Sequence, residues 1–254
     1  MLALLRGNED GWGSPLVAGS LAAAGLALVA LVAIELRSRT PMIPPHAFRS
    51  PRFTAPQVLV FGIAASYFAA FLYLTLYLQG VVGLSPLQTG LAYLPSTALV
   101  FVVSGMAAGL LGRFPAAALA VAGLLLVAAG MLSLAWTTGA DSGWASVLPG
   151  MLLAGVGTGL FNPAASALAL DALPAEQSGL AVGANDTFRQ TGLAVGIAWL
   201  GTFVPAGGLF GADPHAFVAG LHDAVLAAGV LAAACAVAAA ALLARRAPAE
   251  EPGR

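Results

Sequence analysis

The sequence contains no lysine, a single cysteine and few charged residues of any kind. Ten arginines supply all of its fixed positive charge, and acidic and basic residues together make up 8% of the 254 positions, whereas soluble domains carry about 25%. Hydrophobic residues account for 59%. A chain of this composition cannot cover its surface with polar groups in water, so the sequence indicates a membrane protein. The lone Cys235 excludes a disulfide within the chain.

The same absences argue against several enzymatic functions. A retinal protein needs a lysine for its Schiff base, and none is present. The three histidines, His46, His215 and His222, fall in expected loops or at a helix end, where they are not placed to bind a buried haem or metal ion or to activate a buried serine. We therefore predict a protein that is not an enzyme, with no metal site, no bound cofactor and no nucleic-acid partner.

Long apolar runs are the dominant feature of the sequence. A helix that crosses a bilayer needs about 20 mostly apolar residues, and seven stretches approach or exceed that length. They are Pro15–Ile34, Pro56–Leu78, Gln88–Leu111, Ala116–Trp136, Ala145–Leu170, Thr187–Val204 and Ala224–Ala244. The sequence thus predicts an all-α integral membrane fold with about seven transmembrane helices, joined by loops that collect the proline, glycine and charge.

The arginines are distributed unevenly between the two ends of these helices. One end has Arg6 alone. The other end has Arg37, Arg39, Arg49, Arg52, Arg113, Arg189, Arg245, Arg246 and Arg254. Because lysine and arginine are enriched in cytoplasmic loops, this asymmetry predicts a multi-pass protein of the cell (inner or plasma) membrane. Its C-terminus would lie in the cytoplasm and Met1 outside.

The segment "GVGTGLFNP" (Gly155–Pro163) has alternating glycines like those of a phosphate-binding loop. Such a loop follows a strand and opens a helix, whereas this segment lies inside a predicted helix. Leu160 also stands where the nucleotide-binding pattern has its third glycine. Gly155 and Gly159 instead form a G-x-x-x-G pair, which allows a neighbouring helix to approach closely. Two further pairs have this spacing, Gly105–Gly109 and Gly192–Gly196.

Four residues with hydroxyl groups fall within the second apolar run, namely Ser66, Tyr67, Tyr73 and Tyr77. Ser66, Tyr73 and Tyr77 share one helical face, and a face of hydroxylated aromatic rings suits an amphipathic ligand. We therefore consider all four as lining a substrate cavity. An aromatic belt at the membrane interface is the alternative, and it explains Tyr77 better than Tyr67.

A further candidate for the cavity, Asn162, precedes Pro163 inside the fifth apolar run. Proline removes a hydrogen bond to the carbonyl one turn earlier. The amide of Asn162 could satisfy that carbonyl or could contact a ligand, and the sequence leaves both roles open.

No ionisable residue lies clearly at the middle of a predicted membrane helix. Asp186 and Arg189 are three residues apart at a cytoplasmic helix end and could form an ion pair. Asp223 lies where the last run begins, at the predicted outer face, and is the best outer candidate for a proton site. These three residues are candidates for coupling or gating, and an interfacial or capping role is the alternative for each.

Several longer stretches are similar to one transporter family. "YLQGVVGLSPLQTGLAYLP" (Tyr77–Pro95) resembles the Major Facilitator Superfamily, and specifically its fourteen-helix drug:proton antiporters. "GWGSP" (Gly11–Pro15) resembles the outer loop before the eighth helix of that family, and Glu35–Phe53 is similar to the cytoplasmic loop that follows. Gly155–Ala198 resembles the segment across helices twelve and thirteen.

The resemblance implies that the chain corresponds to the C-terminal half of such a transporter. Residues 1–55 would form an outer N-terminal tail, a linker helix and a cytoplasmic loop. Residues 56–244 would form the six-helix half, and residues 245–254 a cytoplasmic tail. The basic G-x-x-x-D-R loop and the antiporter motif of the family's N-terminal half have no counterpart in this sequence. We therefore expect a fragment, a mis-started reading frame or a split subunit.

The function implied by the resemblance is export of amphipathic or cationic small molecules, driven by the proton gradient. The partners implied are the lipid bilayer, an N-terminal half or a second copy of the chain, and a small amphipathic substrate. The residues alone also allow a different class of function, in which the chain is a non-transporting membrane module that packs against a partner membrane protein.

Overall fold

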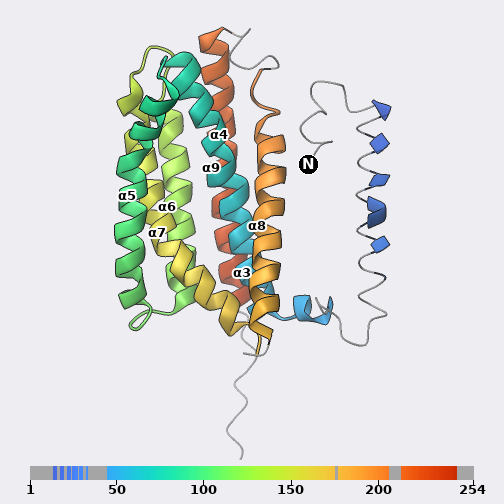
Figure 1. Cartoon of the computed structure of the whole chain (residues 1–254). Coiled ribbons are helices and arrows are strands. Elements are labelled where there is room, and N and C mark those ends of the chain that lie inside the picture. Colours follow the sequence, from blue (N-terminus) through green and yellow to red (C-terminus); the bar gives the residue numbers. More distant parts are fainter. Residues whose placement is uncertain are drawn as a thin grey trace, which may run out of the picture.

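The computed structural model describes residues 45–174, 177–205 and 213–244, together with residues 14, 15, 18, 19, 22, 23, 25–27, 29, 30 and 33. Within these residues the chain is helical and has no strands, which confirms the expectation of an all-α fold. The helices stand side by side in a bundle (Figure 1). They are α3 (Pro51–Ile63), α4 (Ala69–Leu76), α5 (Pro86–Leu110), α6 (Ala116–Thr137), α7 (Leu148–Asp171), α8 (Ser178–Leu200) and α9 (Pro214–Ala244).

The first long helical segment is continuous from Pro51 to Val81. It consists of α3, a π-helical turn η2 (Ala64–Phe68), α4 and a second π-helical turn η3 (Tyr77–Val81). A short 3₁₀ segment, η1 (Pro45–Arg49), precedes it. Pro51 stands at the first turn of α3, where a missing backbone N–H costs nothing. The helix therefore starts earlier than the predicted Pro56, because the apolar run marks the hydrocarbon layer and not the whole helix.

Helix α5 begins at a well-defined turn. Gly83 has a φ of +79°, a backbone conformation that glycine adopts without steric cost. The hydroxyl of Ser85 then accepts a hydrogen bond from the backbone N–H of Gln88, and the Gln88 side chain accepts one from the backbone N–H of Ser85. This reciprocal pair satisfies two N–H groups that the helix itself leaves open, so the sequence sets the start of α5 locally.

Within the described part of the chain, five helical segments are long and apolar enough to cross a membrane: Pro51–Val81, Pro86–Leu110, Ala116–Thr137, Trp144–Asp171 and Pro214–Ala244. The fourth joins α7 to a 3₁₀ turn, η4 (Trp144–Val147). The predicted run Thr187–Val204 corresponds to α8, which carries Asp186 and Arg189 and is not among the five. The predicted run Pro15–Ile34 is described at 11 of its 20 positions, and each of these is helical. Outside the described residues lie Arg6, Arg37, Arg39, Arg245, Arg246 and Arg254.

Two predicted helix starts were wrong. Helix α9 begins at Pro214 and α8 at Ser178, each at least two turns before the apolar runs at Ala224 and Thr187. His222 and Asp223 therefore lie within α9 and not at its first turn. The cause is the same in both cases. A few polar residues, His222 and Asp223 in α9 and Asn185 and Asp186 in α8, interrupt a longer and mostly apolar helix. An apolar run that stops at such residues underestimates helix length.

Helices α6 and α7 touch through their backbones at two glycine pairs. A Cβ added to Gly157 would lie 2.5 Å from the carbonyl oxygen of Gly123, and a Cβ on Gly123 would lie 2.6 Å from that of Gly157. Gly130 and Gly150 oppose each other in the same way, with corresponding distances of 2.6 and 2.7 Å. On each helix the two glycines are seven residues apart, so both pairs lie on the same face of α6 and of α7. The two helices run antiparallel.

Gly157→Ala should therefore destabilise the bundle. The new methyl group would overlap the Gly123 carbonyl and push α6 from α7, and overpacking of this kind costs about 1–3 kcal/mol. The measurement is the unfolding temperature of the detergent-purified chain. Gly105→Ala is the matched control, since its Cβ would meet no atom within 4 Å. Equal unfolding temperatures for the two variants would contradict the contact.

Candidate functional site

The segment "GVGTG" places α7 between two neighbouring helices. Gly157 faces α6, whereas Gly155 and Gly159, two residues to either side, face α5. A Cβ on Gly155 would lie 2.8 Å from the hydroxyl oxygen of Ser96, and a Cβ on Gly159 would lie 2.7 Å from the Cβ of Val103. The alternation of the glycines therefore serves two contacts on opposite sides of one helix.

Two serines of α5 donate hydrogen bonds across this contact. The hydroxyl of Ser96 donates to the carbonyl of Met151 at 2.7 Å, and that of Ser104 donates to the carbonyl of Gly159 at 3.1 Å. The two serines are eight residues apart and so are the two carbonyls. The contact between α5 and α7 therefore keeps one parallel register over more than two turns.

Ser104 satisfies a carbonyl that a proline leaves open. Pro163 lies inside α7 and has no N–H with which to bond the carbonyl of Gly159 four residues earlier. The Ser104 hydroxyl takes that place. The sequence-based suggestion that Asn162 fills this role was therefore wrong, because a residue of α5 supplies the donor and the Asn162 side chain makes no hydrogen bond within the described residues.

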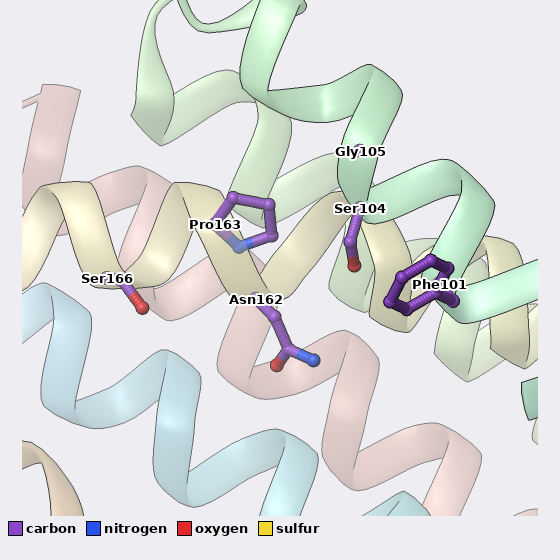
Figure 2. Close-up of a pocket in the computed structure, with 6 residues that line it drawn as sticks. All are labelled: Phe101, Ser104, Gly105, Asn162, Pro163 and Ser166. Carbon is purple, nitrogen blue, oxygen red and sulfur yellow. The ribbon is translucent and has the colours of Figure 1, made fainter.

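An open pocket of about 470 Å³ lies beside this hydrogen bond. Figure 2 shows the Asn162 amide projecting from α7, with Phe101 and Ser104 of α5 next to it. The lining residues are Phe101, Ser104, Gly105, Asn162, Pro163 and Ser166. Since the hydroxyl of Ser104 is already bonded to Gly159, the Asn162 amide and the exposed hydroxyl of Ser166 are the side-chain groups here that can both donate and accept hydrogen bonds to a ligand.

Ser66, Tyr73 and Tyr77, which were predicted to line the substrate cavity from one helical face, form packing contacts within this chain. The hydroxyl of Ser66 donates to the Gly62 carbonyl of its own helix at 2.6 Å. That of Tyr73 donates to the carbonyl of Ile197 in α8. That of Tyr77 donates to the carbonyl of Gly139, between α6 and η4, at 2.8 Å. All three side chains are buried, so none lines the pocket beside Asn162.

Tyr67 packs against two other aromatic rings, Phe71 and Tyr93, in an arrangement that the sequence did not suggest. Its ring meets the edge of Phe71 at a centroid distance of 5.7 Å, and Phe71 lies 4.3 Å from the ring of Tyr93 on α5. The hydroxyls of Tyr93 and Thr75 are 2.9 Å apart. These four side chains connect η2 and α4 to α5. Their only signal in the sequence was the spacing of Tyr67, Phe71 and Thr75 by four residues.

The charged candidates are exposed and unpaired within the described residues. Asp186 and Arg189 lie on the exposed side of α8 and do not form the suggested ion pair. Asp223 is exposed on α9. Its neighbour His222 is the residue that makes contacts, since its Nε2 lies 2.8 Å from the carbonyl oxygen of Thr138 at the end of α6. Because a carbonyl only accepts, Nε2 carries the proton.

The remaining glycine pairs differ from one another. Gly192 and Gly196 bring α8 onto α3 and η2, and a Cβ on Gly192 would lie 2.8 Å from the carbonyl of Phe61. Gly105 and Gly109 have open space, with nothing within 4 Å of an added Cβ. The predicted packing at Gly105–Gly109 is thus not formed with any part of the chain that the structure describes, because that face of α5 points out of the bundle.

The family is decided by sequence comparison. A profile of the Major Facilitator Superfamily matches residues 6–197. The chain belongs to this superfamily. As expected for its members, the fold is an all-α integral membrane fold, with several membrane-spanning helices.

The curated relatives of this superfamily member include drug resistance and export proteins. It is 36% identical to the puromycin resistance protein pur8 of Streptomyces alboniger over 76% of the chain and 39% of that relative. It is 32% identical to the tetracenomycin C resistance and export protein of Streptomyces glaucescens over 79% and 37%. It is also 32% identical to the multidrug resistance protein Stp of Mycobacterium tuberculosis over 84% and 39%. The chain spans about two fifths of the length of these relatives.

Three buried polar side chains of this superfamily member keep atoms without a hydrogen-bond partner among the residues that the structure describes. They are both side-chain polar atoms of Gln57 in α3, the hydroxyl of Thr158 in α7 and the amide oxygen of Asn185 in α8. Sequence reasoning missed all three, although a glutamine or asparagine inside an apolar helix is a signal that could have found Gln57 and Asn185.

The role of Ser104 can be tested by a double-mutant cycle with Pro163. Ser104→Ala alone leaves the Gly159 carbonyl without a donor and should lower the free energy of unfolding by about 0.5–1.5 kcal/mol. In a Pro163→Ala background the restored backbone N–H can bond that carbonyl, so the same substitution should cost clearly less. Unfolding of the four purified proteins in detergent measures the difference, and strictly additive costs would show that Ser104 acts elsewhere.

Proposed function

We propose that residues 56–244 form the C-terminal six-helix half of a proton-coupled exporter of amphipathic or cationic small molecules. Three findings support this proposal. The chain belongs to the Major Facilitator Superfamily, the relatives it matches are named for drug resistance and export, and it covers about two fifths of their length. The other half would be a polypeptide segment outside this sequence or a second copy of the chain.

The observation that carries the proposal is the pocket beside Asn162. The Asn162 amide and the Ser166 hydroxyl, both with free donors and acceptors, stand beside the ring of Phe101, the ring of Pro163 and the backbone of Gly105. Such a surface offers apolar area and two points of hydrogen bonding, which is what an amphipathic molecule needs. The pocket is open, and the second half of the transporter would close it.

The remaining parts of the proposal rest on the resemblance and on charge. The proton gradient would supply the energy, with no bound cofactor and no enzymatic step. Asp186, Arg189 and Asp223 stay candidates for coupling or gating because they are exposed and without ion pairs in the part of the chain that is described. Tyr67, Tyr73 and Tyr77 would contribute to the cavity only if the assembled transporter rearranges their packing contacts. The C-terminus would lie in the cytoplasm of a plasma-membrane protein.

Removal of the Asn162 side-chain amide is expected to weaken transport selectively. The assay is efflux of a panel of cationic and neutral dyes by cells that express the chain joined to the N-terminal half of its coding sequence or of a close relative. Asn162→Ala should raise the apparent KM for hydrogen-bonding substrates about 2- to 10-fold, as expected for one lost hydrogen bond, with unchanged protein in the membrane. The chain expressed alone should give no efflux.

Thr97→Ala is the matched control. Thr97 is exposed on the same helix as Phe101, and its hydroxyl bonds the Tyr93 carbonyl of its own helix at 3.1 Å, so its removal should leave every KM unchanged. If Asn162→Ala behaves like Thr97→Ala for all substrates, the pocket is not the substrate site. If the joined protein transports nothing while folding normally, the non-transporting membrane module becomes the better account.

A further inference from the structure

Three phenylalanine rings from separate elements meet at one end of the bundle. The ring of Phe48 in η1 meets the edge of Phe53 in α3 at a centroid distance of 5.0 Å, and it lies 6.0 Å from the ring of Phe188 in α8. Phe53 is fully buried, whereas Phe48 is 38% exposed. We call Phe48, Phe53 and Phe188 the aromatic cluster. It fixes η1 against two membrane helices.

An exposed arginine stands next to each ring of the aromatic cluster in the sequence. These residues are Arg49, Arg52 and Arg189, and each is exposed. None of them forms an ion pair within the residues that the structure describes. Two exposed acidic residues lie nearby, Asp186 on α8 and Asp171 at the end of α7, where Ala172 and Leu173 pack against the buried group that includes Phe53. The three arginines outnumber them. The arginines lie on the three elements that meet at this cluster, Arg49 on η1, Arg52 on α3 and Arg189 on α8, next to one partly exposed aromatic surface.

The position of this surface along the chain coincides with a membrane boundary. The first membrane-spanning segment begins at Pro51, directly after Arg49 and directly before Arg52. Figure 1 shows η1 beside the ends of α3 and α8, at the edge of the helical bundle. The segment is held there, since the hydroxyl of Thr54 donates to the carbonyl of Phe48 at 2.7 Å. Aromatic and basic side chains at this depth face lipid headgroups.

We propose that Arg49, Arg52 and Arg189 bind the headgroup of an anionic phospholipid, with the exposed edge of Phe48 against its glycerol and upper acyl region. An anionic lipid matches this surface in both charge and shape. A guanidinium group binds a phosphodiester through two parallel N–H donors. A soluble anion would use the arginines but gain nothing from an exposed aromatic ring, whereas a lipid uses both. Nothing in this inference depends on the transport function.

The test is lipid binding by the purified full chain. Native mass spectrometry in mild neutral detergent would follow retention of phosphatidylglycerol and of phosphatidylcholine during titration with each lipid. The chain should retain phosphatidylglycerol preferentially. A basic residue near an anionic membrane surface contributes about fivefold in binding. Each of Arg49→Gln, Arg52→Gln and Arg189→Gln should therefore reduce the preference by about that factor, and the triple variant should abolish it.

Arg113→Gln provides a matched control. Arg113 is exposed and also stands next to a phenylalanine, Phe114, but that ring has no aromatic partner among the described residues, so the lipid preference should be kept. The helix content and unfolding temperature of every variant in neutral detergent should equal those of the parent chain, which separates lost binding from lost folding.

The proposal would be overturned by equal retention of the two lipids by the parent chain, by equal loss of preference in Arg113→Gln and in the cluster variants, or by full displacement of the lipid by millimolar glycerol phosphate. Complete retention of the preference by the correctly folded triple variant would also assign lipid binding to another surface.

Discussion

Backbone contact at glycines is the constraint on which the rest of this bundle depends. Gly157 and Gly123 bring α7 against α6, while Gly155 and Gly159 bring it against α5. At that separation the short side chains of Ser96 and Ser104 reach carbonyls of α7. The carbonyl left open by Pro163 is thereby satisfied, and a proline inside a membrane helix becomes tolerable. The amide of Asn162 is therefore not needed by that carbonyl and remains free to bind a ligand.

Several polar side chains in the membrane-spanning helices form hydrogen bonds within the bundle and are not free to bind a ligand. Ser66, Tyr73 and Tyr77 all donate to backbone carbonyls, as expected where no water competes for them. The membrane-spanning segments differ in how far the bundle buries them. In the most apolar part of Pro51–Val81, 67% of the residues are buried, whereas in that of α5 only 17% are. Helix α5 therefore contributes one face to the bundle and leaves another, with Gly105 and Gly109, for contacts outside the described chain.

The sequence predicts local features of this structure well and partners between helices poorly. Apolar runs locate the helices, and the glycine spacing in "GVGTG" locates a close contact, because both depend on the period of a single helix. The start of α9 was missed because His222 and Asp223 interrupt a largely apolar stretch that is already helical from Pro214. The sequence offered Asn162 as one possible donor to Gly159 and did not suggest Ser104, since that choice depends on the register of α5 against α7, which no local pattern encodes.

The central claim is that the Asn162 pocket receives the transported molecule, and substrate protection tests it most directly. Asn162→Cys in a Cys235→Ala background would be modified with a thiol reagent in the transport-competent assembly. Gly143→Cys would be the control, because Gly143 is exposed and open in the loop before η4. The account predicts that a saturating transported dye slows modification at position 162 and leaves position 143 unchanged. Equal rates at position 162 with and without a dye that is still exported would contradict it.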